Sequence, residues 1–117
     1  MESDLVEISV VIPLYNESEN IEHLFQRLRL TLETLKINYE IICVNDGSKD
    51  NTLEKSIKFN QQKQTIKVIN LSRNFGKEIA LTTGLDCAIG AAIIPINADL
   101  QDPPELIGEL ISKWSEG

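Results

Sequence analysis

The stretch EISVVIPL, residues 7–14, indicates what kind of fold this chain builds. It is a short run rich in β-branched residues that ends at a proline, as buried strands often do. Beyond it, apolar residues recur at helical spacing and predict an amphipathic helix: Ile21, Leu24, Phe25, Leu28, Leu32 and Leu35. Ser18 is the expected cap of this helix, because Glu19 and Glu22 favour its positive N-terminal end. The chain therefore opens as a strand followed by a helix.

The strand–helix pair recurs three more times. Further strands are predicted at YEIICVN, TIKVINL and AAIIPIN, residues 39–45, 65–71 and 91–97. The helices between and after them show apolar stripes: Leu53 and Ile57; Leu81, Leu85, Ala88 and Ile89; and Leu106, Ile107, Leu110, Ile111 and Trp114. This alternation predicts an α/β fold with a mostly parallel sheet and helices on both faces. Right-handed crossovers favour the strand order 3-2-1-4.

Composition limits the possible partners. The 117 residues suffice for one domain, spanning 1–117, and 42% of them are hydrophobic, enough for a core. Eleven basic and eighteen acidic residues give a net charge of −7. Nucleic acid and anionic membranes need a basic face, so this balance excludes both as expected partners.

Targeting and redox signals point to the cytoplasm. Cys43 and Cys87 lack CxxC spacing, so we expect two buried thiols in a reducing compartment. The start MESDLVEI carries no signal-peptide pattern, and no apolar run reaches the roughly 18 residues of a membrane helix. The expectation is a soluble, cytoplasmic chain.

Polar side chains follow the strands at one edge of the predicted sheet. The switch point between the first and fourth strands is where ligands bind in such sheets, beyond the carboxyl ends of the strands. The residues leaving those ends are Tyr15, Asn16 and Glu17, then Asp46, then Asn97, Asp99 and Gln101, with Lys77 at the start of the third helix. One acidic loop alone is best explained by solubility, but several converging loops favour a binding site.

The donor types at this edge favour a hard cation. Carboxylate and amide oxygens select Mg²⁺ or Mn²⁺, whereas zinc would require Cys or His. The single histidine, His23, falls on the polar side of its helix and is expected to be solvated. Neither GxGxxG nor GxxxxGK[ST] occurs, so glycine-loop phosphate binding is not expected. The residues predict a metal-assisted site for a diphosphate-bearing ligand.

Four motifs resemble one enzyme family in order and spacing. VVIPLYNE, VNDGSKDNT, LSRNFGKEIALTTGLDCA and NADLQDPPEL are similar to family 2 glycosyltransferases with the GT-A fold. The resemblance is greatest to the polyisoprenyl-phosphate glycosyltransferases, the group of bactoprenol glucosyltransferase and dolichol-phosphate mannosyltransferase. It runs from Ile8 to Gly117. It implies a Rossmann-like, three-layer half of a GT-A domain that binds a UDP- or GDP-linked sugar.

The resemblance also implies roles for single residues. Pro13, Tyr15 and Glu17 would line the nucleoside pocket, and Asp46 would face the base or ribose. A further pair would meet the diphosphate: Arg73 and Lys77. The structural alternatives are that Tyr15 packs on the first helix and that Lys77 is a solvated charge at a helix start.

The family's metal motif DxD falls on Asn97-Ala98-Asp99, with Gln101 as a further ligand. Asn97 departs from the usual Asp. An amide can offer a neutral oxygen, but it removes one negative charge and should weaken metal affinity. Two readings follow: an enzyme transferring a hexose to a polyprenyl phosphate or another acceptor, and a non-catalytic nucleotide-sugar-binding module. A nucleotidyltransferase is disfavoured, because its glycine- and arginine-rich opening loop is absent.

The family's domain continues into an acceptor-binding half, which is missing after KWSEG at the end of this chain. We therefore expect a fragment, with the catalytic base outside it, from a parent that associates with the membrane through further helices. AAIIPI is apolar on both faces, yet the order 3-2-1-4 makes it an edge strand. An uncovered apolar edge predicts a homodimer or oligomer that uses residues 91–97 and the helix face around Trp114.

Overall fold

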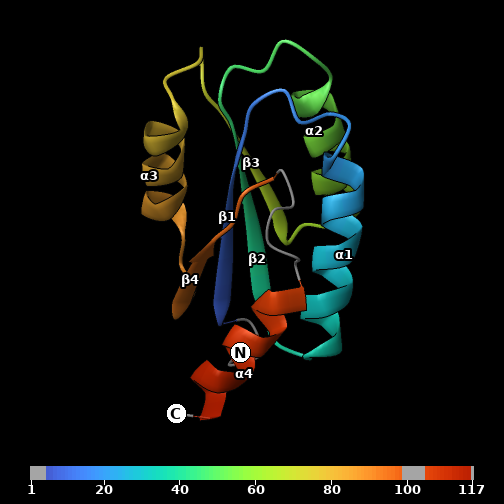
Figure 1. Ribbon diagram of the computed structural model, residues 1–117, viewed down its shortest axis with the longest axis vertical. Coiled ribbons are helices and arrows are strands. Elements are labelled where there is room, and N and C mark those ends of the chain that lie inside the picture. The colour runs from blue at the N-terminus through green and yellow to red at the C-terminus, as the bar shows by residue number, and fades with distance from the viewer. Residues whose placement is uncertain (1–4, 99–104, 117) are drawn as a thin grey trace.

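The computed structural model describes residues 5–98 and 105–116, in which strands and helices alternate (Figure 1). The strands are β1 (Ile8–Leu14), β2 (Tyr39–Asn45), β3 (Ile66–Asn70) and β4 (Ala92–Pro95). The helices are α1 (Ile21–Thr34), α2 (Thr52–Gln62), α3 (Lys77–Cys87) and α4 (Glu105–Glu116). The third and fourth strands are thus shorter than the apolar runs from which they were predicted.

The sheet has the predicted topology. Its order is β3-β2-β1-β4, and every pairing is parallel, with Ile8 of β1 beside Tyr39 of β2 and Ala92 of β4. Figure 1 shows α1 and α2 on one side of the sheet and α3 on the other, with α4 beside the lower end of α1. The predicted α/β class and the strand order 3-2-1-4 are confirmed.

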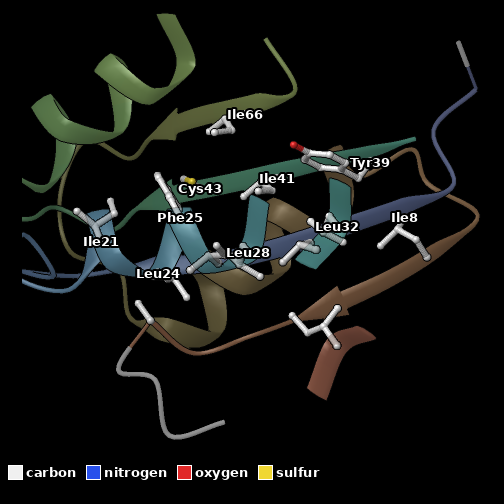
Figure 2. Close-up of a cluster of buried hydrophobic side chains, with 14 of the residues drawn as sticks. Ile8, Ile21, Leu24, Phe25, Leu28, Leu32, Tyr39, Ile41, Cys43 and Ile66 are labelled. Atoms are coloured by element: carbon white, nitrogen blue, oxygen red, sulfur yellow. The ribbon is translucent and has the colours of Figure 1, made fainter. Parts of the chain in front are cut away.

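The larger core lies between the sheet and α1 (Figure 2). The predicted stripe of α1 faces inward, and its buried members are Ile21, Leu24, Phe25, Leu28 and Leu32. The ring of Phe25 meets that of Phe59 from α2 edge to face, with the centroids 4.6 Å apart. Burial of each such side chain contributes roughly 1.5–3 kcal/mol. This core fixes the ends of β1 and β2 relative to the helices.

The face of α3 that packs on the sheet differs from the prediction. Its buried residues are Ala80 and Gly84, whereas Leu85 is 37% exposed and Ile89 is 65% exposed. A side chain at position 84 would overlap Val11 of β1, so the helix lies close to the strands. At such a short separation the interface needs small residues. Of the predicted stripe, Leu81 and Ala88 pack at the edge of this interface as partly buried residues, whereas Leu85 and Ile89, which follows the end of the helix, are exposed.

The expected cap of α1 was also wrong. The N-cap position is Asn20, and neither its side chain nor that of Ser18 caps the helix. The Ser18 amide instead donates to Asp50 at 3.3 Å, and the Ser18 carbonyl accepts from Lys55 Nζ at 2.7 Å. Both contacts reach α2 and the loop before it. Ser18 therefore joins two loops of the sheet edge.

The two cysteines have different environments. Cys43 is buried, and burial raises the pKa of its thiol, whereas Cys87 at the end of α3 is exposed, contrary to the expectation. His23 is exposed, as expected. Within residues 5–98 and 105–116, no helix is both long and apolar enough to cross a membrane.

A buried polar cluster holds the opposite end of the sheet, under the connection from α3 to β4. Ser9 Oγ donates to Glu40 Oε2 at 2.5 Å, the Ile89 amide donates to the same oxygen at 2.9 Å, and Lys67 Nζ lies 2.6 Å from Glu40 Oε1. Gly90 N donates to Ser9 Oγ at 2.8 Å. Desolvation raises the pKa of Glu40, but the bonds from Ile89, Lys67 and Ser9 outweigh it and leave that pKa below its ordinary value.

Candidate functional site

A cavity of about 330 Å³ opens where β1, β2 and β4 end and α3 begins. It lies at the switch point predicted from the strand order, at the end of the sheet where the loops after β1, β2 and β3 gather (Figure 1). Six residues singled out from the sequence line it: Pro13, Tyr15, Glu17, Asp46, Lys77 and Asn97. Four further lining residues were missed: Leu14, Asn74, Gly76 and Ala98.

Three predicted residues are not placed in this cavity. Arg73 does not line it, and its guanidinium carbon lies 4.8 Å from the centre of the Phe75 ring. Asp99 and Gln101 lie outside the described residues. Among the missed residues, Asn74 and Gly76 lie between Arg73 and Lys77, in the short segment that leads into α3. An asparagine and a glycine directly before a helix are the usual sign of a tight turn, which could have identified them.

The loop after β1 is tied to the loop after β2. Asn16 has a left-handed backbone with φ of 53°, a conformation that asparagine tolerates better than most residues. Its amide donates to Ser48 Oγ at 2.9 Å, and its side-chain oxygen accepts from the Lys49 amide at 2.8 Å. Tyr15 and Glu17, on either side of Asn16, are thereby fixed at the cavity wall.

A second set of hydrogen bonds joins the same two loops at the residues that follow in the chain. The Glu17 amide donates to Thr52 Oγ1 at 2.8 Å, and Asp50 accepts from the amides of Thr52 and Ser18 at 3.0 and 3.3 Å. Desolvation raises the pKa of Asp50, but the hydrogen bonds from the hydroxyl and amide of Thr52 and from Ser18 outweigh it and lower that pKa to about 2. The carboxylate therefore stays charged at neutral pH and keeps both loops in one arrangement.

Asp46 is buried at the floor of the cavity, with 3% of its surface exposed. Its Oδ1 accepts from the Phe75 amide at 2.8 Å, and its Oδ2 accepts from the Gly76 amide at 3.1 Å. Both oxygens are thus used by the loop that leads into α3. The predicted contact of Asp46 with a base or ribose stays a prediction, and any such contact would add to these two bonds.

The charges around the cavity are mixed. Glu17 and Asp46 contribute carboxylates, and Lys77 contributes an ammonium group. In the described part of the chain, no three His, Cys, Asp or Glu side chains are grouped so that they could hold a metal ion. Asn97, two residues after the end of β4, contributes an amide to the cavity wall. The cavity can therefore receive a polar ligand whose anionic portion lies toward Lys77.

Comparison with known proteins identifies relatives along almost the whole chain. Residues 9–117 match the family described as "Glycosyl transferase family 2". An uncharacterized glycosyltransferase of Synechocystis sp. is 65% identical over 112 residues, which are 96% of this chain and 35% of that protein. A prophage bactoprenol glucosyl transferase homolog of Escherichia coli is 44% identical over 96% of this chain and 37% of its own length. The chain thus spans about a third of these relatives.

Solved structures share the fold. S. aureus TarS 1–349 in complex with UDP-GlcNAc matches with a TM-score of 0.77 and 24% identity, over 95% of this chain and 32% of that one. The mannosyltransferase PcManGT from Pyrobaculum calidifontis, in complex with GDP-Man and Mn²⁺, matches with a TM-score of 0.74 and 20% identity, over 90% and 31%. These likenesses confirm the expected GT-A type of fold.

Proposed function

The chain belongs to glycosyl transferase family 2, and from this we propose that its cavity binds a nucleotide diphosphate sugar, UDP- or GDP-linked, as the donor of a glycosyl transfer. The observation that carries the proposal is the gathering of side chains from four separate segments around one cavity. The sequence motifs indicate the same segments independently of the contacts in the structure. Two proteins with this fold have been solved with UDP-GlcNAc and with GDP-Man, which supports this class of ligand.

The cavity suggests how the donor would lie. Its β1 side offers Pro13 and the ring of Tyr15, which is 42% exposed and free to meet a base, with Glu17 in reach of ribose hydroxyls. The ammonium group of Lys77 stands at the start of α3, where a diphosphate would be attracted. The nucleoside would thus lie toward β1 and the phosphates toward α3. Arg73, which is engaged with Phe75, would approach the phosphates only from outside the cavity.

A divalent cation belongs to the proposal. Asn97 lines the cavity, and Asp99 and Gln101 follow it in the chain. These donors are all oxygens, which fit Mg²⁺ or Mn²⁺ and do not fit zinc. When bound, such an ion neutralises charge on the leaving diphosphate. With one carboxylate in the three-residue motif, we expect this chain to bind the metal more weakly than a variant with two.

The proposed reaction transfers a hexose to an acceptor, with a polyprenyl phosphate as the first candidate. Its support is the relative named as a bactoprenol glucosyl transferase homolog. An acceptor oxygen would form a bond to the anomeric carbon while the bond to the diphosphate oxygen breaks, releasing a nucleoside diphosphate. The group that takes the acceptor's proton in an inverting displacement is expected outside these 117 residues. The whole protein is proposed to work at the cytoplasmic face of the membrane.

Calorimetric titration tests donor binding directly. UDP- and GDP-sugars are titrated into the protein with and without Mn²⁺, and saturable, Mn²⁺-dependent binding of at least one is expected. Asp99→Ala should abolish the metal-dependent part, and Asn97→Asp should increase Mn²⁺ affinity. Asp86→Ala, an exposed carboxylate near the other end of α3, is the matched control. Binding of no UDP- or GDP-sugar would refute the donor site, and an unchanged Mn²⁺ affinity in Asn97→Asp would remove Asn97 from the metal.

Asn97 favours a second candidate, a nucleotide-sugar-binding module without catalysis. A transfer assay with labelled donor and polyprenyl phosphate separates the two. Turnover by the full-length protein supports the enzyme, whereas intact binding without turnover supports the module. The 117-residue chain alone is expected to bind donor without turnover. Transfer by this chain would contradict the proposal that the catalytic base lies outside it.

The chain is also proposed to associate with a second copy of itself through the outer strand β4. In the described sheet, β4 pairs with β1 on one side only, and its Ile93 is 40% exposed. An apolar outer strand with free backbone groups favours pairing with a second copy. The expected contact comprises residues 91–97 and the face of α4 around Trp114, whose side chain lies outside the described part. Light scattering over a concentration series tests this, and a constant monomeric mass would refute it.

A further inference from the structure

We propose that Ser9 and Glu40 are positioning residues for the donor site: they fix the start of β4 on the sheet and thereby set where Asn97 stands at the cavity. The inference rests on the proposed function and deepens it. Neither Ser9 nor Glu40 lines the cavity, so their effect on a ligand must pass through β4.

The first evidence is the way in which the connection from α3 to β4 is held. Figure 1 shows this connection at the end of the sheet away from the loops that follow β1 and β2. The Ile89 amide donates to Glu40 Oε2 at 2.9 Å, and the Gly90 amide donates to Ser9 Oγ at 2.8 Å. Ser9 Oγ in turn donates to Glu40 Oε2 at 2.5 Å. Two successive amides just before β4 are thus held by side chains of the two central strands.

The second evidence is that these two side chains are themselves fixed. Ser9 is fully buried and Glu40 is 1% exposed, and they are register partners on β1 and β2. Lys67 Nζ, on β3, lies 2.6 Å from the other Glu40 oxygen. Because water competes little for bonds in a buried cluster, the bonds define one position for the connection. A Cβ at Gly90 would lie 2.6 Å from Ser9 Oγ and 2.9 Å from the carbonyl carbon of Ile8, so the connection lies directly on β1.

The sequence of β4 makes such an anchor necessary, because its apolar pattern does not define its register. In the structure Ala92 lies beside Ile8, and Ile94 lies beside Val10. The strand region reads AAIIPI over residues 91–96, so a shift of one residue would again put an alanine and an isoleucine in these places. Burial of apolar side chains at these two positions therefore does not distinguish the two registers.

The same shift would change the cavity. Asn97 would move to the place of the buried Ala98, and Ile96 would take the place of Asn97 at the cavity wall. An apolar side chain would then stand where the amide is now. Pro95 opposes the shift, because it has no N–H and would occupy the position from which the Ile96 amide donates to the Val11 carbonyl at 3.0 Å. The anchor at the start of β4 supplies two further bonds that select the observed register.

Hydrogen exchange tests the anchor without a ligand. Ser9→Ala removes the acceptor of the Gly90 amide. Exchange of the Ile96 amide, which bonds β4 to β1, should become about tenfold faster. Exchange of the Asp46 amide, which donates to the Leu14 carbonyl at 2.8 Å, should stay within about twofold of wild type. A general loss of stability would instead accelerate both amides together.

A second variant and two controls support this measurement. Gly90→Ala should give the same pattern as Ser9→Ala, because it pushes the connection away from β1 by contact instead of by a lost bond. Gly108→Ala, in which a Cβ meets Thr31 at an ordinary 3.4 Å, is the matched control. Lys67→Met removes the ion pair of Glu40 and neither bond to the connection, so the ratio of the two exchange rates should not change.

Nucleotide binding then tests the link to the cavity. Dissociation constants for UDP and GDP are measured with Mn²⁺, well below the unfolding temperature. Ser9→Ala should weaken binding about fivefold, as expected for the loss of about one hydrogen bond to the ligand. In an Asn97→Ala background the same substitution should change affinity by less than about twofold, because both residues act through one amide. Lys67→Met should leave affinity within about twofold of wild type, since β4 keeps its anchor.

The two experiments separate failure of this inference from failure of the donor site. If the wild-type protein binds neither UDP nor GDP, the donor site and the link to Asn97 fail, while the exchange rates still decide whether Ser9 and Glu40 fix β4. An equal response of the Ile96 and Asp46 amides in both Ser9→Ala and Gly90→Ala overturns the anchor. Unchanged nucleotide affinity in Ser9→Ala, or a loss that persists in full in the Asn97→Ala background, overturns the link through Asn97.

Discussion

Replacement of the buried Glu40 by glutamine is expected to destabilise the fold by about 2 kcal/mol at pH 7. The amide keeps one acceptor oxygen, which would stay with Ser9 and Ile89, and turns its NH₂ group toward Lys67. The side chain of Lys67 is 49% exposed and can turn to water, so the lost ion pair contributes only about 1 kcal/mol. The hydrogen bonds from Ser9 and Ile89 then have a neutral acceptor instead of a charged one. Each of these two changes adds about 0.5 kcal/mol to the loss of stability.

The same substitution predicts a pH dependence. The pKa of Glu40 in the folded state lies below its ordinary value of 4.5, so the folded protein takes up this proton less readily than the unfolded chain. The carboxylate's contribution is therefore complete above pH 4.5 and is lost as the pH falls through the folded pKa. The difference between wild type and Glu40→Gln should shrink in that acidic range.

Urea unfolding followed by circular dichroism measures both effects, and thermal unfolding should show a midpoint lower by about 6–10 °C. Glu109→Gln, on the exposed surface of α4, makes the same chemical change without the buried contacts and should stay within about 0.5 kcal/mol of wild type. A Glu40→Gln protein as stable as this control at pH 7 would refute the assignment of the polar cluster as a stabilising feature.

Two further predictions concern the sheet and the loops of the cavity. Gly84→Ala should lower the free energy of unfolding by about 1–2 kcal/mol, because the overlap with Val11 outweighs the roughly 1 kcal/mol gained in helix propensity. If the variant is as stable in urea as the wild type, or more stable, α3 can move away from the sheet and the prediction is wrong. Asp50→Asn should cost about 0.5–1 kcal/mol at pH 7, the small value reflecting an exposed group. Because the folded pKa of Asp50 is depressed from 3.8 to about 2, that difference should fade between about pH 4 and pH 2 in acid titrations of stability, and a constant difference would contradict it.

The strand order was predictable because right-handed crossovers between alternating strands and helices allow few topologies, and the burial of β1 and β2 agrees with it. Both strands are buried almost throughout, which only a central position allows. The inward face of α3 was not predictable in the same way. Hydrophobic periodicity selects large residues such as Leu85, whereas the close approach to the sheet selects Ala80 and Gly84. How near two layers lie is a tertiary property that residue spacing does not encode.

In the candidate site, too, some features could be predicted from the sequence and others could not. Its location followed from topology, since the carboxyl ends of parallel strands bring distant loops to one edge. The partners of Asp46 did not follow, because the amides of Phe75 and Gly76 reach it across a long stretch of chain. Ser9 and Glu40 were also missed as a pair, since in a strand pattern each is only a polar interruption. The metal motif at Asp99 and Gln101 lies outside the described residues and stays a prediction.

The missing side chain at Gly84 has a mechanical consequence. Because a Cβ at position 84 would overlap Val11, the backbone of α3 lies against β1 with no intervening side chain at this point. The segment that leads into α3 is tied to the end of β2 as well, since Asp46 accepts from the amides of Phe75 and Gly76. The wall that α3 and the sheet form is therefore expected to keep its spacing when ligands of different size bind.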